Sequence, residues 1–217
     1  MSASPQVILI EKEGVRQIIS LQEWEAICGA TFSSSLEFES PSLRSKIEKK
    51  TEKLYKKGEL SRQQIWFGSY FKKEMEASYF PDVVLRYINP TLGWGVFAEK
   101  NFRKTEFIAE YSGLLRKSRR SDKTNAYCFE YTLANGVKTP YTIDAQDKGG
   151  LARFLNHSTT PNVLSVLATR GFVSHVILIT QREIKKGEQL CYDYGEDYWL
   201  YREKPIEISS PQDKPFE

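Results

Sequence analysis

Two short stretches of the sequence carry side chains that could perform chemistry. Residues 156–158 read Asn-His-Ser and place an amide, an imidazole and a hydroxyl in direct succession. Residues 192–194 read Tyr-Asp-Tyr, so that two tyrosines flank a carboxylate. The first stretch is typical of a site that binds a polar ligand, and it lacks the nucleophile-and-base spacing that a hydrolase requires. We therefore expect the two stretches to form one pocket, in which the first holds a ligand and the second acts on it.

Composition limits the classes of protein to which the chain can belong. Its 217 residues fit one domain, or one domain with a small companion. A net charge of +3 is small for a dedicated nucleic-acid binder, so no direct nucleic-acid binding is expected. No apolar run is long enough to span a bilayer, and no membrane partner is expected. No motif specifies an oligomeric state.

The cysteines argue against a metal site. Cys28, Cys128 and Cys191 lie far apart in the sequence, and no pair of them has the spacing of zinc ligands. The chain has only 2 histidines, so we expect no bound metal. A reducing compartment is the simplest interpretation of this cysteine usage.

The first part of the chain predicts short strands followed by helices. The segment Val7–Trp24 mixes apolar and charged residues, which fits two strands or a strand and a helix. The segment Leu43–Met75 is rich in Lys, Glu, Arg and Gln, with apolar residues at helical spacing. We predict two helices here, broken near Gly58, with Ser61 as the N-cap of the second.

A basic cluster lies within the first of these helices, between Lys46 and Lys57. It could be a nucleic-acid-binding helix or a solvated helix face. The acids Glu48 and Glu52 interrupt the cluster and can pair with cations three and four residues away. This pairing favours the solvated face.

From Val83 onward the sequence predicts a mainly β structure. Short segments rich in β-branched and aromatic residues alternate with Gly, Pro and Asn turns. The expected strands cover residues 83–87, 93–98, 107–113, 127–133, 140–144, 173–180 and 188–192, with an Asn135-Gly136 hairpin signal between the fourth and the fifth. Many short strands with tight turns indicate several small twisted sheets.

Four motifs in this second part resemble those of the SET-domain protein lysine methyltransferases. They occur in the order and spacing of that family: Gly93-Trp94-Gly95, Tyr111-Ser112-Gly113, the Arg-Phe-Leu-Asn-His-Ser run at 153–158 with Pro161-Asn162, and the Leu-Cys-Tyr-Asp-Tyr-Gly run at 190–195. The resemblance is greatest to compact bacterial, chlamydia-type members that lack the zinc-binding cysteines before and after the domain.

The resemblance implies an architecture. It is a SET fold, mainly β with minor α, of several small twisted sheets, preceded by a helical N-terminal region. Residues 153–162 and 190–195 would lie side by side and thread as a C-terminal pseudoknot. Residues 1–82 would form a candidate docking or dimerisation element, residues 83–201 the SET domain, and residues 202–217 a tail that closes the lysine channel or is disordered.

The resemblance also implies an activity. It is transfer of methyl groups from S-adenosyl-L-methionine to lysines of a basic protein, a histone or a bacterial histone-like protein, mainly to the mono- or dimethyl state. The alternative is a catalytically silent module that binds basic peptides or chromatin; the intact Tyr111, Asn156, His157 and Tyr194 favour the enzyme. The localisation would be cytoplasmic or, for a secreted bacterial effector, the host nucleus.

Three tyrosines carry the catalytic role in this family pattern. Tyr194 would lie beside the transferred methyl group, with Tyr111 opposite it in the channel. Tyr192 would occupy the position where a hydroxyl, by holding a water, limits the number of methyl groups added. A tyrosine with a pKa near ~10 is protonated at neutral pH, so positioning of the amine is favoured over general-base catalysis.

Cofactor-binding positions follow from the same pattern. The backbone of Gly93–Gly95, with Trp94 between the glycines, would contact the amino-acid end of S-adenosyl-L-methionine. Asn156 would bind its amino group, His157 would serve the adenine through its backbone, and Tyr127 would contact it from the insert of the domain.

Several neighbours have structural interpretations instead. His157 is interpreted as a hydrogen-bonded scaffold group rather than a base. Arg153 is expected to be an ion-pair partner, and Asp193 to point away from the channel because side chains alternate along a strand.

Further residues are expected to close the lysine channel and to line the peptide groove that leads to it. In the absence of a cysteine-rich tail, closure is assigned to aromatic residues, namely Tyr198, Trp199, Tyr201 and Phe216. The peptide groove is expected to be acidic, with candidates at Glu130, Asp144, Asp147, Glu196, Asp197 and Glu203. A solvated loop is the equally weighted alternative for these acids.

Overall fold

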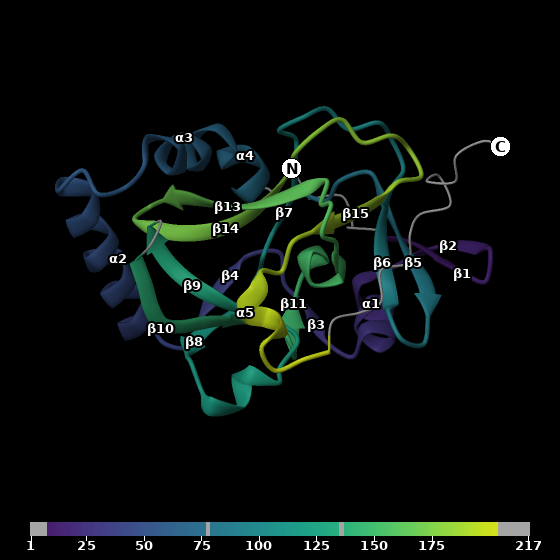
Figure 1. Cartoon of the computed structure of the whole chain (residues 1–217), viewed down its shortest axis with the longest axis horizontal. Helices are drawn as coiled ribbons and strands as arrows, with labels where there is room; N and C mark the ends of the chain where they lie inside the picture. Colours follow the sequence, from purple (N-terminus) through teal and green to yellow (C-terminus); the bar gives the residue numbers. More distant parts are fainter. Residues whose placement is uncertain (1–7, 77–78, 135–136, 204–217) are drawn as a thin grey trace.

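The computed structural model describes residues 8–76, 79–134 and 137–203, and most of its elements are strands (Figure 1). The strands are β1 Ile8–Lys12, β2 Val15–Ile19, β3 Thr31–Phe32, β4 Leu36–Phe38, β5 Val83–Asn89, β6 Gly93–Ala98, β7 Phe107–Glu110, β8 Gly113–Lys117, β9 Cys128–Ala134, β10 Val137–Asp144, β11 Lys148–Gly149, β12 Asn156–His157, β13 Val163–Arg170, β14 Val173–Thr180 and β15 Gln189–Tyr192. The α-helices are α1 Leu21–Cys28, α2 Pro41–Lys56, α3 Arg62–Tyr70, α4 Lys72–Glu76 and α5 Glu196–Trp199. Short 3₁₀ helices occupy Arg120–Lys123 and Leu151–Phe154. The mainly β class predicted from the sequence is confirmed.

The strands form several small sheets, as the turn-rich sequence predicts. The described residues contain a six-stranded sheet in the order β12-β15-β6-β5-β1-β2 and a four-stranded sheet in the order β4-β8-β10-β9. A three-stranded sheet, β13-β14-β7, and the pair β11-β3 complete them. Strands β9 and β13 each lie at one edge of their sheet. No helix in the described ranges is long and apolar enough to cross a membrane.

Strands from the first part of the chain pair with strands from the second. Strand β1 lies parallel to β5, with Ile10 opposite Leu85, and β4 lies parallel to β8. The main core cluster accordingly mixes Ile8, Trp24 and Ile47 with residues of the later strands. The N-terminal region therefore contributes to the same sheets and core as the predicted SET segment.

The N-terminal helices agree with the sequence pattern. Helix α2 begins after Ser40, whose side chain accepts a hydrogen bond from the backbone N–H of Leu43, and Gly58 follows its end with a φ of 72°. Ser61 caps α3 by accepting from the N–H of Gln64. The two predicted helices and the Ser61 cap are confirmed, and the short helix α4 follows them. The Val7–Trp24 segment contains β1, β2 and the start of α1.

Two strands depart from the prediction. The single strand expected over 107–113 is two, because β7 ends at Glu110 and the chain turns before β8 begins at Gly113. Strand β13 was not predicted, since its sequence follows a polar, Pro-containing segment and does not alternate regularly. The Asn135-Gly136 hairpin signal lies outside the described residues.

Helix α3 lies directly on β13 (Figure 1). A Cβ at Gly68 would lie 1.8 Å from the backbone oxygen of Thr169, so only glycine permits this approach. The side-chain amide of Gln64 donates to the backbone oxygen of Leu133 at 2.7 Å and to the hydroxyl of Thr169 at 2.7 Å. These contacts join α3 to the ends of β9 and β13.

Candidate active site

The two stretches singled out in the sequence lie side by side. Strand β12 is parallel to β15, with Asn156 opposite Cys191 and His157 opposite Tyr192. The side chain of Asn162 joins them, because its oxygen accepts from the N–H of Cys191 at 2.9 Å and its amide donates to the backbone oxygen of Gln189 at 2.8 Å. The predicted adjacency is confirmed, while the threading of the two segments stays an expectation of the family resemblance.

A cluster of tyrosines, with Tyr192 buried and Tyr194 half-buried, forms at the end of β15. The rings of Tyr192 and Tyr194 have centroids 4.8 Å apart, and the Tyr194 hydroxyl donates to the backbone oxygen of Leu155 at 2.7 Å. The Tyr111 hydroxyl donates to the backbone oxygen of Tyr127 at 3.0 Å. The structure thus brings the three predicted catalytic tyrosines together from the ends of β7 and β15.

These tyrosines remain neutral at physiological pH. Burial raises the pKa of Tyr111, and it raises the pKa values of Tyr192 and Tyr194 well above the usual value. The phenols also disfavour each other's ionisation, since Tyr111 acts on the other two in the same direction. They can donate hydrogen bonds and present apolar faces, but they cannot serve as bases without a large free-energy cost.

His157 and Asp193 surround the backbone of Tyr194. The Nδ1 atom of His157 accepts from the N–H of Tyr194 at 3.2 Å, and its side chain is 12% exposed. The carboxylate of Asp193 is 61% exposed and accepts from the N–H of Gly195 at 2.9 Å. Both contacts agree with the structural roles expected for these side chains, because each fixes the chain around Tyr194.

The Gly93–Gly95 strand lies against Asn156. The amide of Asn156 donates to the backbone oxygen of Trp94 at 3.4 Å. A Cβ at Gly95 would lie 2.7 Å from the side chain of Gln189 and 3.1 Å from the amide of Asn156. Glycine at this position therefore makes room for Asn156, whereas the space beside Gly93, which has a φ of 66°, is open.

Arg153 corrects one prediction. It forms no ion pair with any residue in the described part of the chain; its guanidinium lies 4.3 Å from the Tyr127 ring and 5.2 Å from the Phe154 ring. Its Nε and Nη1 atoms are buried and have no hydrogen-bond partner among the described residues. The ion-pair prediction is wrong because aromatic rings, rather than a carboxylate, surround the cation.

Helix α5 packs its aromatic side chains against the tyrosine cluster. Tyr198 and Trp199 have ring centroids 4.7 Å and 6.1 Å from that of Tyr194, and Trp199 also lies 4.9 Å from the His157 ring. Arg202 donates to the backbone oxygen of Asn125 at 2.7 Å. Two of the expected closing aromatics therefore lie on the cluster.

The other two expected closing aromatics lie elsewhere. Tyr201 instead contacts Lys123, whose ammonium lies 2.9 Å from its hydroxyl. Phe216 lies outside the described residues, as does most of the predicted 202–217 tail.

The predicted groove acids separate into two groups. Asp144 is paired with the buried Arg116 at 2.6 Å, so it is not free to bind a peptide. Arg116 also pairs with Asp122 at 2.7 Å, and these two ion pairs allow the Arg116 side chain to be buried in β8. Glu130 and Asp197 remain at the surface and share Lys138 at 3.4 Å and 3.7 Å.

A groove of about 420 Å³ lies between α3 and the edge strands β9 and β13. Phe129 and Thr132 line it from β9, and Val166 and Leu167 from β13. The ring of Phe129 is also 4.9 Å from that of Tyr111. Phe129 thus connects the groove to the tyrosine cluster.

The cysteines are not arranged for metal binding or nucleophilic chemistry. Burial raises the pKa of Cys28 to about 11, of Cys128 to about 12 and of Cys191 to about 11. Within the described ranges no group of three or more His, Cys, Asp and Glu side chains could hold a metal ion.

Sequence reasoning missed three contributors to the site: the backbone oxygen of Leu155, the ring of Phe129 and the guanidinium of Arg202. Phe129 lies two residues after Tyr127, so position in the sequence could have marked it. Leu155 acts through its backbone, and Arg202 depends on a contact across the fold, so no residue pattern marks either.

Comparisons with known proteins agree with this geometry. Residues 93–195 match the family model described as SET domain. N-lysine methyltransferase KMT5A of Xenopus tropicalis is 37% identical over 113 residues, covering 48% of this chain and 33% of the relative. Histone-lysine N-methyltransferase Su(var)3-9 of Drosophila melanogaster is 33% identical over 114 residues, covering 47% of this chain and 18% of the relative.

The chain spans about a third or less of these relatives' lengths. Among solved structures, Arabidopsis thaliana SUVH6 in complex with SAM aligns with a TM-score of 0.49 and 28% identity, covering 60% of this chain and 31% of that chain. Residues 93–195 are thus similar to SET domains, and the relatives that match this part of the chain are lysine methyltransferases.

Proposed function

We propose that the protein transfers methyl groups from S-adenosyl-L-methionine to lysine side chains of a protein substrate. The cluster of neutral tyrosines formed by the buried Tyr111 and Tyr192 and the half-buried Tyr194 carries this proposal. It lies between Phe129, which lines the groove, and the Asn156–His157 stretch. The names of the relatives, which are lysine methyltransferases, support it.

The residues around Asn156 fit a cofactor with an amino-acid end and an aromatic base. Gly93 leaves open space, Gly95 admits the Asn156 amide, and Trp94 and Tyr127 offer partly buried aromatic faces. The buried, unpaired Nε and Nη1 atoms of Arg153 are donors that a polar ligand could satisfy. When bound, S-adenosyl-L-methionine supplies an electrophilic methyl group on a sulfonium.

The tyrosine cluster prepares the nucleophile. A free lysine has a pKa near ~10.4, so releasing its proton at neutral pH costs roughly 4 kcal/mol in water. Aromatic walls lower that pKa by desolvation of the ammonium form. The hydroxyls of Tyr194 and Tyr111 are each held by a backbone carbonyl, so the walls are rigid and the amine is held in one orientation.

The groove supports a peptide substrate. Among the described residues, β9 and β13 each lie at one edge of their sheet, and an extended peptide can add a strand to such an edge through main-chain hydrogen bonds. Glu130 and Asp197 add negative charge near β9 and α5, which favours a basic partner. We place a histone or bacterial histone-like tail in this groove.

Three finer points belong to the same proposal. Tyr192 leaves space for one or two methyl groups, so the expected product is mainly mono- or dimethyllysine. The chain is assigned to the compact bacterial type of SET protein, although the relatives quoted above are from eukaryotes. Its location is then the bacterial cytoplasm or, for a secreted effector, the host nucleus, which fractionation of infected cells would test.

Labelled S-adenosyl-L-methionine tests the activity. The protein is incubated with core histones and bacterial basic proteins, next to Tyr194→Phe and a surface control, Tyr55→Phe. Wild type and Tyr55→Phe are expected to label a substrate, and Tyr194→Phe to label it at least about 100-fold more slowly, because the hydroxyl that fixes the ring on Leu155 is gone. Cofactor binding without labelling of any protein would instead favour a silent module that binds basic peptides or chromatin.

A further inference from the structure

Helix α2 carries two rows of charged residues, and the rows differ in whether their side chains form ion pairs. One row, spaced by four residues, consists of Arg44, Glu48, Glu52 and Lys56, and it contains the ion pairs Arg44–Glu48 at 2.9 Å and Lys56–Glu52 at 2.7 Å. These are the i,i+4 pairs expected of a solvated face. This part of the sequence-based interpretation is confirmed.

The second row is purely basic. Lys46, Lys50, Lys53 and Lys57 follow one another at intervals of three and four residues, with Lys49 beside Lys50, so the five project from one side of the helix. We call these residues the lysine row. All of them are exposed, and the four on the helix itself form no ion pair with any residue of the described part; Lys57, at its end, approaches Glu59 at 3.4 Å.

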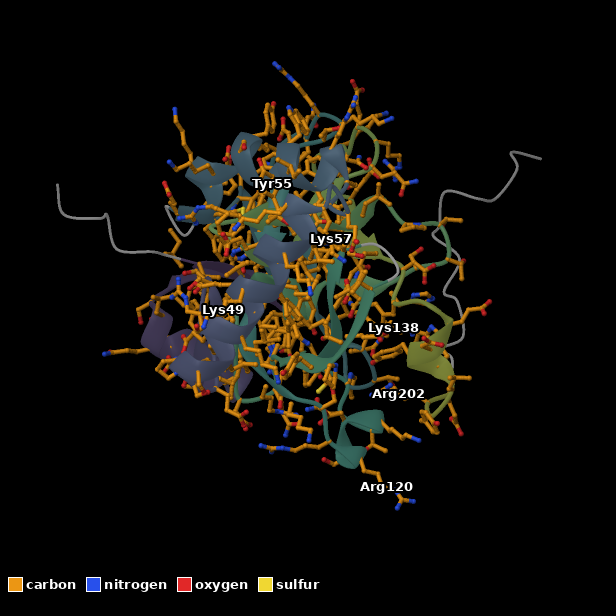
Figure 2. All side chains as sticks on the ribbon, turned by 90° about the vertical axis from the view of Figure 1, so that its left-hand side faces the viewer. Lys49, Tyr55, Lys57, Arg120, Lys138 and Arg202 are labelled. Carbon is orange, nitrogen blue, oxygen red and sulfur yellow. The ribbon has the colours of Figure 1, made fainter. Side chains whose placement is uncertain are left out.

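The row extends onto the neighbouring sheet. The ammonium of Lys46 lies 5.9 Å from the centre of the Tyr141 ring. Lys117 is directly opposite Tyr141 in the β8–β10 ladder, and side chains opposite each other in an antiparallel pair share a face of the sheet. Lys117 therefore continues the basic surface from α2 onto β8. Figure 2 shows Lys49 and Lys57 on α2 and Arg120 at the lower end of the same view.

The physical cost of this arrangement argues for a polyanionic partner. Unpaired like charges one turn apart on a helix repel each other, so the row destabilises the free protein slightly. The acids that could neutralise it are confined to the other row, where they pair with Arg44 and Lys56. The row spans about 16 Å at ~1.5 Å per residue, enough to face several phosphates of a duplex that carries one charge per ~1.7 Å.

Other polyanions fit less well. A membrane-binding helix needs a free apolar face, and the apolar face of α2 is buried in the protein through Leu43, Ile47 and Thr51. Single-stranded nucleic acid is held by aromatic side chains between the cations, and no aromatic residue interrupts the row, since Tyr55 packs against Phe172 on another side. Lysine alone supplies charge without a bidentate reading of bases.

We propose that the lysine row, with Lys117, binds the phosphate backbone of double-stranded DNA without sequence preference. The surface is formed by α2 and β8, away from the β12–β15 strands that carry the candidate active site. The proposal departs from the expectation, based on the small net charge, that the chain does not bind nucleic acid directly. The small net charge does not reveal this local cluster of lysines, because acidic residues elsewhere in the sequence offset its positive charge in the total.

Fluorescence anisotropy with a short mixed-sequence duplex tests the proposal on the full chain, between about 50 and 200 mM NaCl. The test variant carries Lys49→Gln, Lys50→Gln and Lys53→Gln, which keep good helix formers on an exposed face. The matched control carries Arg103→Gln, Lys104→Gln and Lys185→Gln. These residues are exposed cations on the loops before β7 and β15, and like the three substituted lysines they form no ion pair among the described residues.

Wild type and control should bind with affinity that falls steeply as salt rises. The test variant should bind at least about tenfold more weakly, with a slope of log affinity against log salt that is shallower by roughly 2 to 3. An equal loss in the control, or no binding by wild type at the lowest salt, would overturn the proposal. Tighter binding to single-stranded RNA of the same length, or to phosphatidylserine vesicles, would overturn the choice of duplex DNA.

These measurements do not depend on methyl transfer. A wild type that binds DNA but labels no protein would leave the lysine row in place and remove the proposed activity. Melting temperatures of the two triple variants within a few degrees of wild type would show that both are folded, so that a lost affinity reports lost contacts.

Discussion

Tyr192 is the residue that we expect to limit the number of methyl groups in the product. Its side chain is buried at 6% exposure beside Tyr194, on the wall of the tyrosine cluster. Tyr192→Phe removes one hydroxyl and any water it holds, and so enlarges the space for a methylated amine. We expect the product to shift from mono- and dimethyllysine toward trimethyllysine, measured by mass spectrometry of substrate peptides.

The control for this change is Tyr201→Phe, whose hydroxyl contacts Lys123 away from the cluster. An unchanged product distribution in Tyr192→Phe would remove Tyr192 from the limiting position. Since both substitutions keep an aromatic ring, neither should prevent folding.

The ion pair of Asp122 predicts how the free energy of unfolding changes at acidic pH. Burial alone would raise its pKa, but hydrogen bonds from the Arg116 side chain and the Arg119 backbone outweigh burial and lower it. A carboxyl whose pKa is lower in the folded state stabilises the fold above its ordinary pKa, near ~3.9, and this contribution is lost as the pH falls through the lower folded value. The free energy of unfolding should therefore decline below about pH 4.

Asp122→Asn should be less stable than wild type at neutral pH and lose less stability on acidification. Urea unfolding at several pH values measures this difference. Asp197→Asn is the control, because that carboxylate is 80% exposed and should leave the acid limb unchanged. A parallel decline in wild type and Asp122→Asn would assign the acid sensitivity to other carboxylates.

At the scale of elements, the contact of α3 with β13 is the closest that any described glycine makes, since a Cβ at Gly68 would lie 1.8 Å from the backbone oxygen of Thr169. Gly68→Ala would place a methyl group against the backbone of Thr169, and neither backbone can move without disturbing the Gln64 hydrogen bonds. We expect a loss of about 3 kcal/mol in the free energy of unfolding. Ser69→Ala, on the exposed side of the same helix, should change it by less than about 0.5 kcal/mol.

Chemical denaturation measures both variants. Equal stabilities would mean that α3 lifts off β13 at little cost. In that case the groove that α3 helps to line would be adjustable rather than preformed.

The elements differ in how far the sequence determined them. Capping serines, the break near Gly58 and the apolar spacing located the N-terminal helices, because these are local signals. Strand β13 depends on pairing with β14 and on cover from α3, and such contacts leave no local pattern. The same reasoning explains Arg153, whose aromatic neighbours come from a distant segment and a 3₁₀ turn.

The site motifs were more predictable than their surroundings. Asn156, His157 and Tyr194 lie in contiguous runs, so the adjacency of their strands followed from the family pattern. The groove between β9 and β13 could not be predicted, since it needs the relative placement of two sheets and a helix.

At the scale of the whole molecule, residues before Val83 are part of the main core. Ile8, Trp24 and Ile47 pack in the same cluster as Leu85 and residues of the later strands. A chain of residues 83–217 would lose β1, one of the two strand partners of β5, and expose these apolar surfaces. We expect it to show no cooperative thermal transition by circular dichroism, in contrast to the full chain.

A cooperative transition in the shortened chain would instead show that residues 1–82 are an appended element. Binding of labelled cofactor by that chain would strengthen this conclusion. The test therefore separates a composite fold from a domain with a companion.

The bond between Arg202 and the Asn125 carbonyl has a kinetic consequence. Together with the Lys123–Tyr201 contact, this bond holds the segment after α5 against Lys123 and Asn125. Both contacts must break before α5 can uncover Tyr194 and His157. At roughly 1 kcal/mol for each contact, the uncovered form is a few per cent of the population. A ligand that enters beneath α5 then associates at a few per cent of its intrinsic association rate. Once it is enclosed, its dissociation rate is reduced by the same factor. The closing segment would thereby lengthen the residence time of a bound ligand at the expense of the speed with which it is exchanged.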